Sequence, residues 1–291
     1  MNVSLRPARN WKLVVSYDGT DYSGWQVQPG QATIQGELQA ALGRVTGESP
    51  LPQGSGRTDA GVHALGQVAS FALAASIPAD SLRRALNRTL PAAIRVVGAQ
   101  VAPASFHARH STVAKTYEYR VFLEPRRTGP MGEPDDDAAY AVVCPPFVAR
   151  YVYSYPWPLD LAELERAATL FVGTHDYLSF AATDPDAATR AAAGAENEAG
   201  ESTSLGAVRT IYASRWEQRH MDEGTLFVYR VRGSGFLHHM VRNLVGTMLD
   251  VGRGYRRAEE IPGMLAARSR AAAGPTAPGR GLFLHSVEYP E

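Results

Sequence analysis

The segment Gly54-Ser55-Gly56-Arg57-Thr58-Asp59-Ala60-Gly61-Val62-His63-Ala64 is the most informative part of this sequence. It places one acid, Asp59, two residues after Arg57, among glycines that tolerate positive φ and the close approach of another chain. Residues 67–71 follow as a short β-like run that would anchor the segment. The spacing alone leaves two interpretations open. The segment is either a turn whose aspartate caps its own backbone or a rigid loop that presents a carboxylate for chemistry.

The sequence on both sides of this segment predicts helices and strands in mixed order. Apolar residues at helical spacing predict a helix from Thr33, and Pro78 is expected in the first turn of a second helix that runs to residue 88. Asp160 and Glu163 fit a capping box that begins a helix ending at Gly173. Further helices are predicted at residues 236–251 and 258–268. Strands are predicted at residues 12–17, 67–71, 94–101, 115–122, 208–218, 225–232 and 282–289.

Two mixed halves of this kind favour an α+β fold. We expect duplicated ferredoxin-like halves, with mixed, mainly antiparallel sheets and a catalytic cleft between the domains. A chain of 291 residues fits two domains, and we place them at residues 8–110, which carry the Asp59 loop, and 111–291. Residues 183–206 lack aromatic residues and periodicity, so we predict a disordered insertion there.

Composition restricts the class of protein. The lone Cys144 excludes an intramolecular disulfide framework, which fits a reducing compartment. The sequence contains neither a signal-peptide run nor a membrane-spanning apolar stretch, so we expect a cytoplasmic protein with no membrane partner.

Charge is balanced overall, with 29 basic and 29 acidic residues, but it is not evenly distributed. Residues 133–137 and 184–201 are acidic, and the rest of the chain holds 28 basic against 20 acidic residues. Both a phosphate-binding face and a solvated mixed surface are compatible with that excess.

The segment from Gly56 to Ala64 resembles the signature of the tRNA pseudouridine synthase A (TruA) family. Six further segments resemble the same family in the same order, so the likeness extends from about residue 11 to residue 290. These segments are Tyr17-Asp18-Gly19-Thr20 with Gly24-Trp25-Gln26, Phe106-His107-Ala108-Arg109, Lys115-Thr116-Tyr117-Glu118-Tyr119, Gly173-Thr174-His175-Asp176-Tyr177, Phe236-Leu237-His238-His239-Met240-Val241-Arg242-Asn243, and Pro275-Thr276-Ala277-Pro278 leading to Gly281-Leu282.

The resemblance implies the same fold and a tRNA pseudouridine synthase that isomerises uridine at positions 38–40 of the anticodon stem-loop. It also implies a homodimer, with tRNA lying across both subunits, and Asp59 as the catalytic nucleophile. The residues leave three routes open for that carboxylate: attack on sugar C1′, attack on base C6, or removal of a sugar proton.

Two further catalytic residues are predicted. Arg242 lies on a narrow polar stripe of the helix expected at residues 236–251 and needs a partner there. The family pattern implies that this partner is Asp59, and an ordinary salt bridge to Asp250 or to another surface acid is the alternative. The resemblance also implies that Tyr117 stacks on the target base. A tyrosine packed in the core is the alternative, and it suits Tyr119.

The predicted substrate-binding residues are Arg57, Thr58, His63, Lys115 and Tyr117. The resemblance implies that Arg57 holds the nucleotide out of its helix, which costs a few kcal/mol of unstacking. Phosphate contacts are assigned only as a group, to arginines 83, 84, 88, 109, 253, 256 and 257.

No cofactor or metal is expected. The reaction is an isomerisation, and the sequence has neither a GxxxxGK nor a GxGxxG motif. His107 with His110, or His238 with His239, are the conceivable metal ligands, but no cysteine pair or HExxH frame accompanies them.

Two other functions remain as alternatives. One is an RNA-binding module without turnover, against which the family-like positions of Arg57, Asp59, Tyr117 and Arg242 argue. The other is a glycosidase-like hydrolase, which normally needs two carboxylates where this motif offers one acid beside an arginine.

Overall fold

The computed structural model describes residues 7–124, 143–182 and 206–290, and it divides the chain into two compact units. Unit 1 comprises residues 1–116 and 282–291, and unit 2 comprises residues 117–281. The division falls inside a strand, β5 (Ala114–Leu123), and the last strand of the chain returns to unit 1. Residues 183–205 of the predicted insertion lie outside the described residues.

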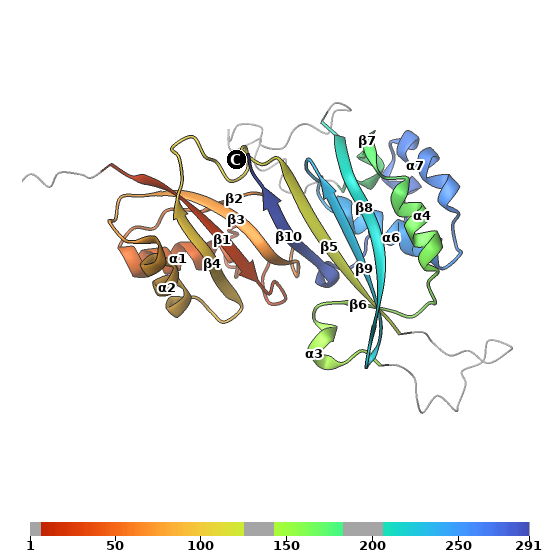
Figure 1. The fold of residues 1–291 in the computed structure, drawn as a ribbon, viewed down its shortest axis with the longest axis horizontal. Coiled ribbons are helices and arrows are strands. Elements are labelled where there is room, and N and C mark those ends of the chain that lie inside the picture. Colours follow the sequence, from red (N-terminus) through yellow and green to blue (C-terminus); the bar gives the residue numbers. More distant parts are fainter. Residues whose placement is uncertain (1–6, 125–142, 183–205, 291) are drawn as a thin grey trace, which may run out of the picture. The chain divides into compact units, whose positions relative to one another are not determined.

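Unit 1 is built on a sheet with the strand order β4–β1–β3–β10 (Figure 1). Strand β1 is antiparallel to both of its neighbours, whereas β10 runs parallel to β3, and the short β2 pairs with β3. The strands are β1 (Arg9–Tyr17), β2 (Gln53–Gly54), β3 (His63–Leu73), β4 (Ile94–Val101) and β10 (Leu282–Glu288).

Two helices, α1 (Ile34–Thr46) and α2 (Ala79–Thr89), bury their leucines in unit 1. Thr33 caps α1 by accepting a hydrogen bond from the Gly36 amide, as an N-cap threonine is expected to do. Pro78 is the N-cap residue of α2 and not part of its first turn, because its backbone is extended (ψ 144°).

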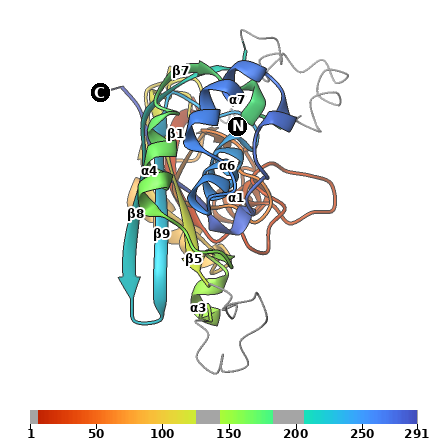
Figure 2. The same ribbon diagram turned by 90° about the vertical axis from the view of Figure 1, so that its right-hand side faces the viewer.

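Unit 2 has the strand order β5–β9–β8–β7, with β6 parallel to β5. The strands predicted at residues 208–218 and 225–232 form an antiparallel hairpin of β8 (Val208–Met221) and β9 (Gly224–Gly233), which lie side by side in Figure 2. The other strands are β6 (Tyr153–Tyr155) and β7 (Gly173–Asp176). The helices are α3 (Pro146–Ala149), α4 (Leu161–Thr169), α6 (Met240–Gly252) and α7 (Ile261–Ala267), with 3₁₀ turns η1 (Leu178–Phe180), η2 (Ala258–Glu260), η3 (Arg270–Ala272) and η4 (Gly279–Gly281).

Three helix predictions in unit 2 were wrong in their bounds. Helix α6 begins at Met240 instead of residue 236, because His239 has a left-handed backbone (φ 57°) that interrupts helical hydrogen bonding. Helix α4 ends at Thr169, and Gly173 (φ 116°) begins a strand instead of ending the helix. The helix predicted at residues 258–268 is split into η2 and α7.

The residues that α6 contributes to the predicted polar stripe are buried, apart from Arg242. Every residue of α6 is buried except Arg242, so Asn243 and Asp250 face packed protein and not solvent. A helix that is buried all round must satisfy its polar groups internally.

The α+β class and the mixed sheets are confirmed. The duplicated ferredoxin-like plan and the catalytic cleft stay predictions. No helix among the described residues is long and apolar enough to cross a membrane.

Candidate active site

The loop that carries Asp59 connects β2 to β3 in unit 1. Ser55, Thr58 and Val62 are buried, Arg57 is exposed, and Asp59 is half-buried. The more exposed residues Arg57 and Asp59 thus alternate with the buried Thr58 along the loop. The buried residues fix the loop, and the two charged residues lie at the surface of the unit.

Gln67 anchors the start of this loop. Its fully buried side chain accepts a hydrogen bond from Ser55 Oγ at 2.7 Å and donates one to the Gly56 carbonyl at 2.9 Å. Lys115 Nζ donates to the Ser55 carbonyl at 2.6 Å. A Cβ at Gly56 would lie 2.9 Å from that ammonium group, so glycine makes room for it. Lys115 therefore supports the loop backbone, and its predicted substrate-binding role stays a prediction.

Thr58, next to the candidate nucleophile, is held on two sides. Its hydroxyl is hydrogen-bonded to Tyr17 Oη at 2.8 Å, and its carbonyl accepts from the Trp25 amide at 3.0 Å. Burial raises the pKa of Tyr17 to about 12, so this phenol stays protonated at neutral pH. Gly24 has a φ of 90°, and a Cβ there would lie 2.5 Å from the Thr58 carbonyl oxygen. The family-like segments around Tyr17 and Trp25 thus hold the Asp59 loop in place through hydrogen bonds to Thr58.

The turn after Asp59 is closed by backbone groups. The Val62 amide donates to the Asp59 carbonyl at 3.1 Å, and the Gly61 amide donates to the Tyr22 carbonyl at 3.3 Å. Gly61 has a φ of 73°, a conformation that glycine adopts without steric cost.

His63 follows this turn as the first residue of β3. Its side chain is only 1% exposed, accepts a hydrogen bond from the Gly19 amide through Nδ1, and stacks on Phe283. These contacts are structural, as are those of Thr58. The predicted substrate-binding roles of both residues stay predictions.

Tyr117 and Tyr119 lie on β5 in unit 2 and differ in their surroundings. Tyr117 is 8% exposed and packs edge-on against Phe236, with ring centroids 5.0 Å apart. Tyr119 is fully buried and donates to the Pro278 carbonyl at 2.7 Å, and burial raises its pKa. Tyr119 is therefore confirmed as a core residue.

Glu118, between these tyrosines, is a buried carboxylate with two cationic partners. It accepts hydrogen bonds from Arg120 Nε at 2.7 Å and from Arg230 Nε at 2.8 Å. Burial alone raises the pKa of Glu118, but the two arginines outweigh burial, and the net result is a lowered pKa. The residue fixes β5 against its neighbours.

Arg242 is the one residue of α6 that is not fully buried. Its Nε donates to the Ala277 carbonyl at 2.7 Å, and the Ala277 amide donates back to the Arg242 carbonyl. Gly246, one turn further along, faces the Pro275 carbonyl so closely that any side chain would overlap it. Asp250 lies two turns from Arg242 and pairs with Arg253 and Arg256.

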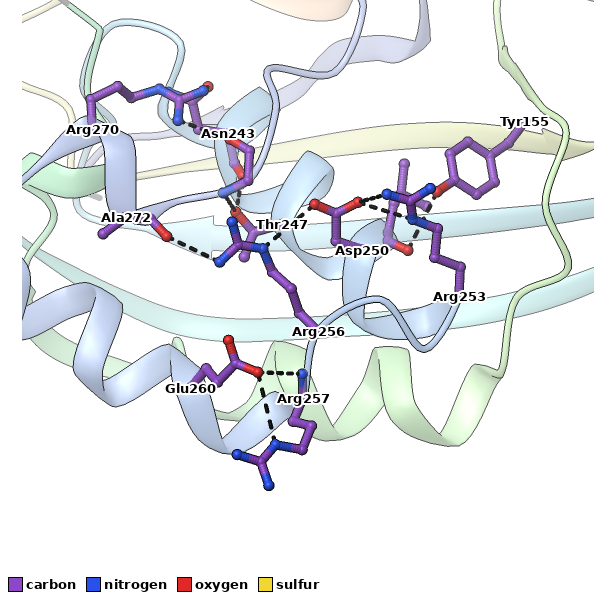
Figure 3. A network of polar contacts seen from close by, with 12 residues as sticks. Tyr155, Asn243, Thr247, Asp250, Arg253, Arg256, Arg257, Glu260, Arg270 and Ala272 are labelled. Carbon is purple, nitrogen blue, oxygen red and sulfur yellow. Dashed lines mark hydrogen bonds and ion pairs between the residues drawn. The ribbon is translucent and has the colours of Figure 1, made fainter.

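Sequence reasoning missed the buried network around Asn243. Its side chain accepts from Arg270 Nη2 at 3.1 Å (Figure 3). It also accepts from Thr276 Oγ1 at 2.6 Å and donates to the Phe180 carbonyl. The network holds residues 270–277, and with them the Ala277 carbonyl, against α6. Gln67 was missed in the same way. A polar residue inside an otherwise apolar strand was the available signal for Gln67. For Asn243 the signal was its place on the polar stripe predicted on the helix, but the stripe does not show which segment covers it.

The histidines of the segment at residues 106–109 have a local role. His107 Nδ1 accepts from the backbone amides of Arg109 and His110, and the rings of His107 and His110 lie 4.3 Å apart. This nitrogen is used to stabilise a turn.

A family model described as tRNA pseudouridine synthase matches residues 13–111 and 167–290, which include the Asp59 loop and α6. The chain belongs to the tRNA pseudouridine synthase family. As a pseudouridine synthase it is an isomerase.

Three similar proteins carry the name tRNA pseudouridine synthase A. The one from Solibacter usitatus is 44% identical over 282 residues, which cover 97% of this chain and 100% of the relative. The one from Halalkalibacterium halodurans is 43% identical, covering 93% of this chain and 89% of the relative. The one from Bacillus pumilus is 40% identical, covering 96% and 98%. The similarity of this pseudouridine synthase to its relatives therefore spans both units.

Proposed function

We propose that this enzyme converts uridine to pseudouridine in tRNA, at positions 38–40 of the anticodon stem-loop, with Asp59 as the nucleophile. In this reaction the C1′–N1 bond breaks and a C1′–C5 bond forms. The C5 proton is lost to solvent, and N1 gains a proton. Atoms and electrons balance without an oxidant, a reductant or an energy donor.

The observation that carries the proposal is the anchoring of the Asp59 loop. Two residues that precede Asp59 are tied to buried partners, Gly56 to Gln67 and Thr58 to Tyr17. The turn after Asp59 is closed by the backbone amides of Gly61 and Val62. A carboxylate that attacks a sugar or a base gains rate from such a fixed position, because little freedom is lost on reaching the transition state.

Three other residues are proposed to serve the same reaction. The exposed Arg57 would hold the nucleotide out of its helix. Tyr117 would offer an aromatic surface to the base, and Arg242 would favour the ionised state of the nucleophile. The enzyme is proposed to act in the cytoplasm as a homodimer, without metal or cofactor.

The test uses an anticodon stem-loop carrying tritium at uridine C5. The wild-type enzyme should release tritium, and Asp59→Asn should reduce release to background, because an amide cannot replace the attacking carboxylate. Asp80→Asn is the matched control, since Asp80 is an exposed acid of α2 paired with Arg83. That variant should retain the wild-type rate.

Two outcomes would count against the proposal. Absence of tritium release by the wild type, from stem-loops of several tRNAs that it binds, would favour an RNA-binding module. Wild-type release by Asp59→Asn would remove Asp59 from the mechanism.

A further inference from the structure

An open groove of about 680 Å³ lies at the C-terminal end of α6 in unit 2. Its charged lining consists of Asp250, Arg253, Arg256 and Arg270, and small residues of the 271–275 segment complete it. Figure 3 shows Arg253 and Arg256, from the loop after α6, meeting at Asp250 of α6, whereas Arg270 of η3 points toward Asn243. We call this feature the Arg253 groove.

The Arg253 groove holds three guanidinium groups against one carboxylate. Asp250 Oδ1 accepts from Arg253 Nη2 at 2.7 Å, and Asp250 Oδ2 lies 3.7 Å from Arg256 Nε. Among the described residues this buried Arg256 Nε has no hydrogen-bond partner. One carboxylate cannot neutralise three cations, so the groove retains positive charge.

Arg270 contributes charge without neutralisation by an acid. The oxygens that it contacts are neutral and belong to Gly274, Asn243 and Thr276. Burial lowers the pKa of Arg270, as expected for a cation held in partly desolvated surroundings. An anion bound in the groove would stabilise the charged form of this guanidinium.

Tyr255 adds an exposed aromatic ring to this cationic surface. The residue is 70% exposed, and the Arg253 guanidinium lies 4.6 Å from the centre of its ring. The backbone beside it is fixed, because the amides of Tyr255 and Arg256 both donate to the Asp250 carbonyl. An exposed ring on a fixed backbone among arginines suits stacking with a nucleobase.

We propose that the Arg253 groove binds phosphate groups of RNA, with Tyr255 stacking on a neighbouring base. One guanidinium group can donate two parallel hydrogen bonds to the oxygens of a phosphate. The ring of Tyr255 adds a surface on which a base can stack, which favours RNA over free phosphate as the ligand. The inference rests on the proposed function, which makes tRNA the substrate. It assigns an RNA contact to unit 2, whereas Asp59 lies in unit 1.

The experiment measures the Kd of the full-length enzyme for a full-length tRNA transcript at several salt concentrations. Arg253→Gln and Arg256→Gln should each weaken binding severalfold and reduce the slope of log K against log salt by about 0.7–0.9 per lost phosphate contact. Tyr255→Ala should weaken binding about fivefold or more, with little change in slope.

Matched controls lie elsewhere in unit 2. Tyr212 is 44% exposed with Arg232 over its ring, and Arg219 is an exposed arginine paired with Glu217. Tyr212→Ala and Arg219→Gln should bind tRNA as the wild type does. Arg256→Lys keeps the charge but loses the paired donors, so it should preserve the salt slope while losing part of the affinity. Tyr255→Ala removes only an exposed ring, so it tests the groove even if an arginine variant unfolds.

Unchanged Kd values and salt slopes in folded groove variants would overturn the proposal. Saturable binding of pyrophosphate that the variants abolish, with unchanged tRNA affinity, would identify a small-phosphate site and overturn it too. Tritium release separates this inference from the proposed function. A wild type that binds tRNA through the groove but releases no tritium would refute only the proposed catalysis.

Discussion

Replacing Gln67 with leucine should loosen the Asp59 loop without leaving a large cavity. Leucine has a similar volume to glutamine but can neither accept from Ser55 Oγ nor donate to the Gly56 carbonyl. Both groups would then be left without these partners, Ser55 in a fully buried place and Gly56 in a half-buried one. The change therefore acts on the two residues that immediately precede Arg57.

The magnitude follows from the two lost hydrogen bonds. A buried polar group left unsatisfied costs about 1–3 kcal/mol, and two such groups would cost about 2–6 kcal/mol. Because Gly56 is only half-buried, Gln67→Leu should lower the free energy of unfolding by about 2–4 kcal/mol. Catalysis should suffer further, because a displacement of about 1 Å at a reacting group costs on the order of 10²-fold in rate. We expect kcat for tritium release to fall about 10- to 100-fold, with a smaller change in KM.

The assay compares tritium-release kinetics with urea unfolding curves, so that rates refer to folded protein. Gln67→Glu keeps an acceptor for Ser55 but has no donor for the Gly56 carbonyl, and it should lose part of the rate. Asn87→Leu is the control, because Asn87 also makes two hydrogen bonds to backbone, both with Val96 at 2.8 Å between α2 and β4. It should destabilise the protein without lowering kcat. An equal loss of kcat in Asn87→Leu and Gln67→Leu would refute the reasoning.

Two further predictions concern unit 2. Glu118→Gln should lower the free energy of unfolding by about 2–3 kcal/mol, measured in urea, because charge-assisted hydrogen bonds to Arg120 and Arg230 are weakened. The pKa of Glu118 is lowered in the folded state, so its stabilisation is present above about pH 4.3 and lost as pH falls through the folded pKa. The wild-type advantage over Glu118→Gln should therefore shrink in acid, and a constant difference would contradict this. Gly246→Ala should destabilise by about 1–3 kcal/mol despite alanine's better helix propensity, because its methyl group would overlap the Pro275 carbonyl; an unchanged melting temperature would contradict that.

The sequence by itself determined the family, the secondary-structure types and the position of the Asp59 loop. These features are local or motif-based. Thr33 caps its helix through a neighbouring amide, and the β8–β9 hairpin turns within a few residues. Periodicity and turn chemistry report such short-range geometry directly.

The tertiary structure alone decided which polar residues are buried. On a helical projection Asn243 and Asp250 belong to a polar stripe, but the segments that cover them lie elsewhere in the sequence, at residues 253–256 and 270–277. Periodicity records which residues share a helix face and does not record what packs on that face. For the same reason the start of α6 was predicted four residues too early. The left-handed backbone of His239, which precedes the first helical residue, is not visible in the periodicity.

The supports of the Asp59 loop were beyond sequence reasoning for the same physical reason. Tyr17, Trp25 and Gln67 contact the loop because strand pairing brings distant segments together, with β3 antiparallel to both β1 and β2. The sequence supplied the carboxylate and its neighbouring arginine. Only long-range packing determined how firmly that carboxylate is held and which arginines of unit 2 gather into one groove.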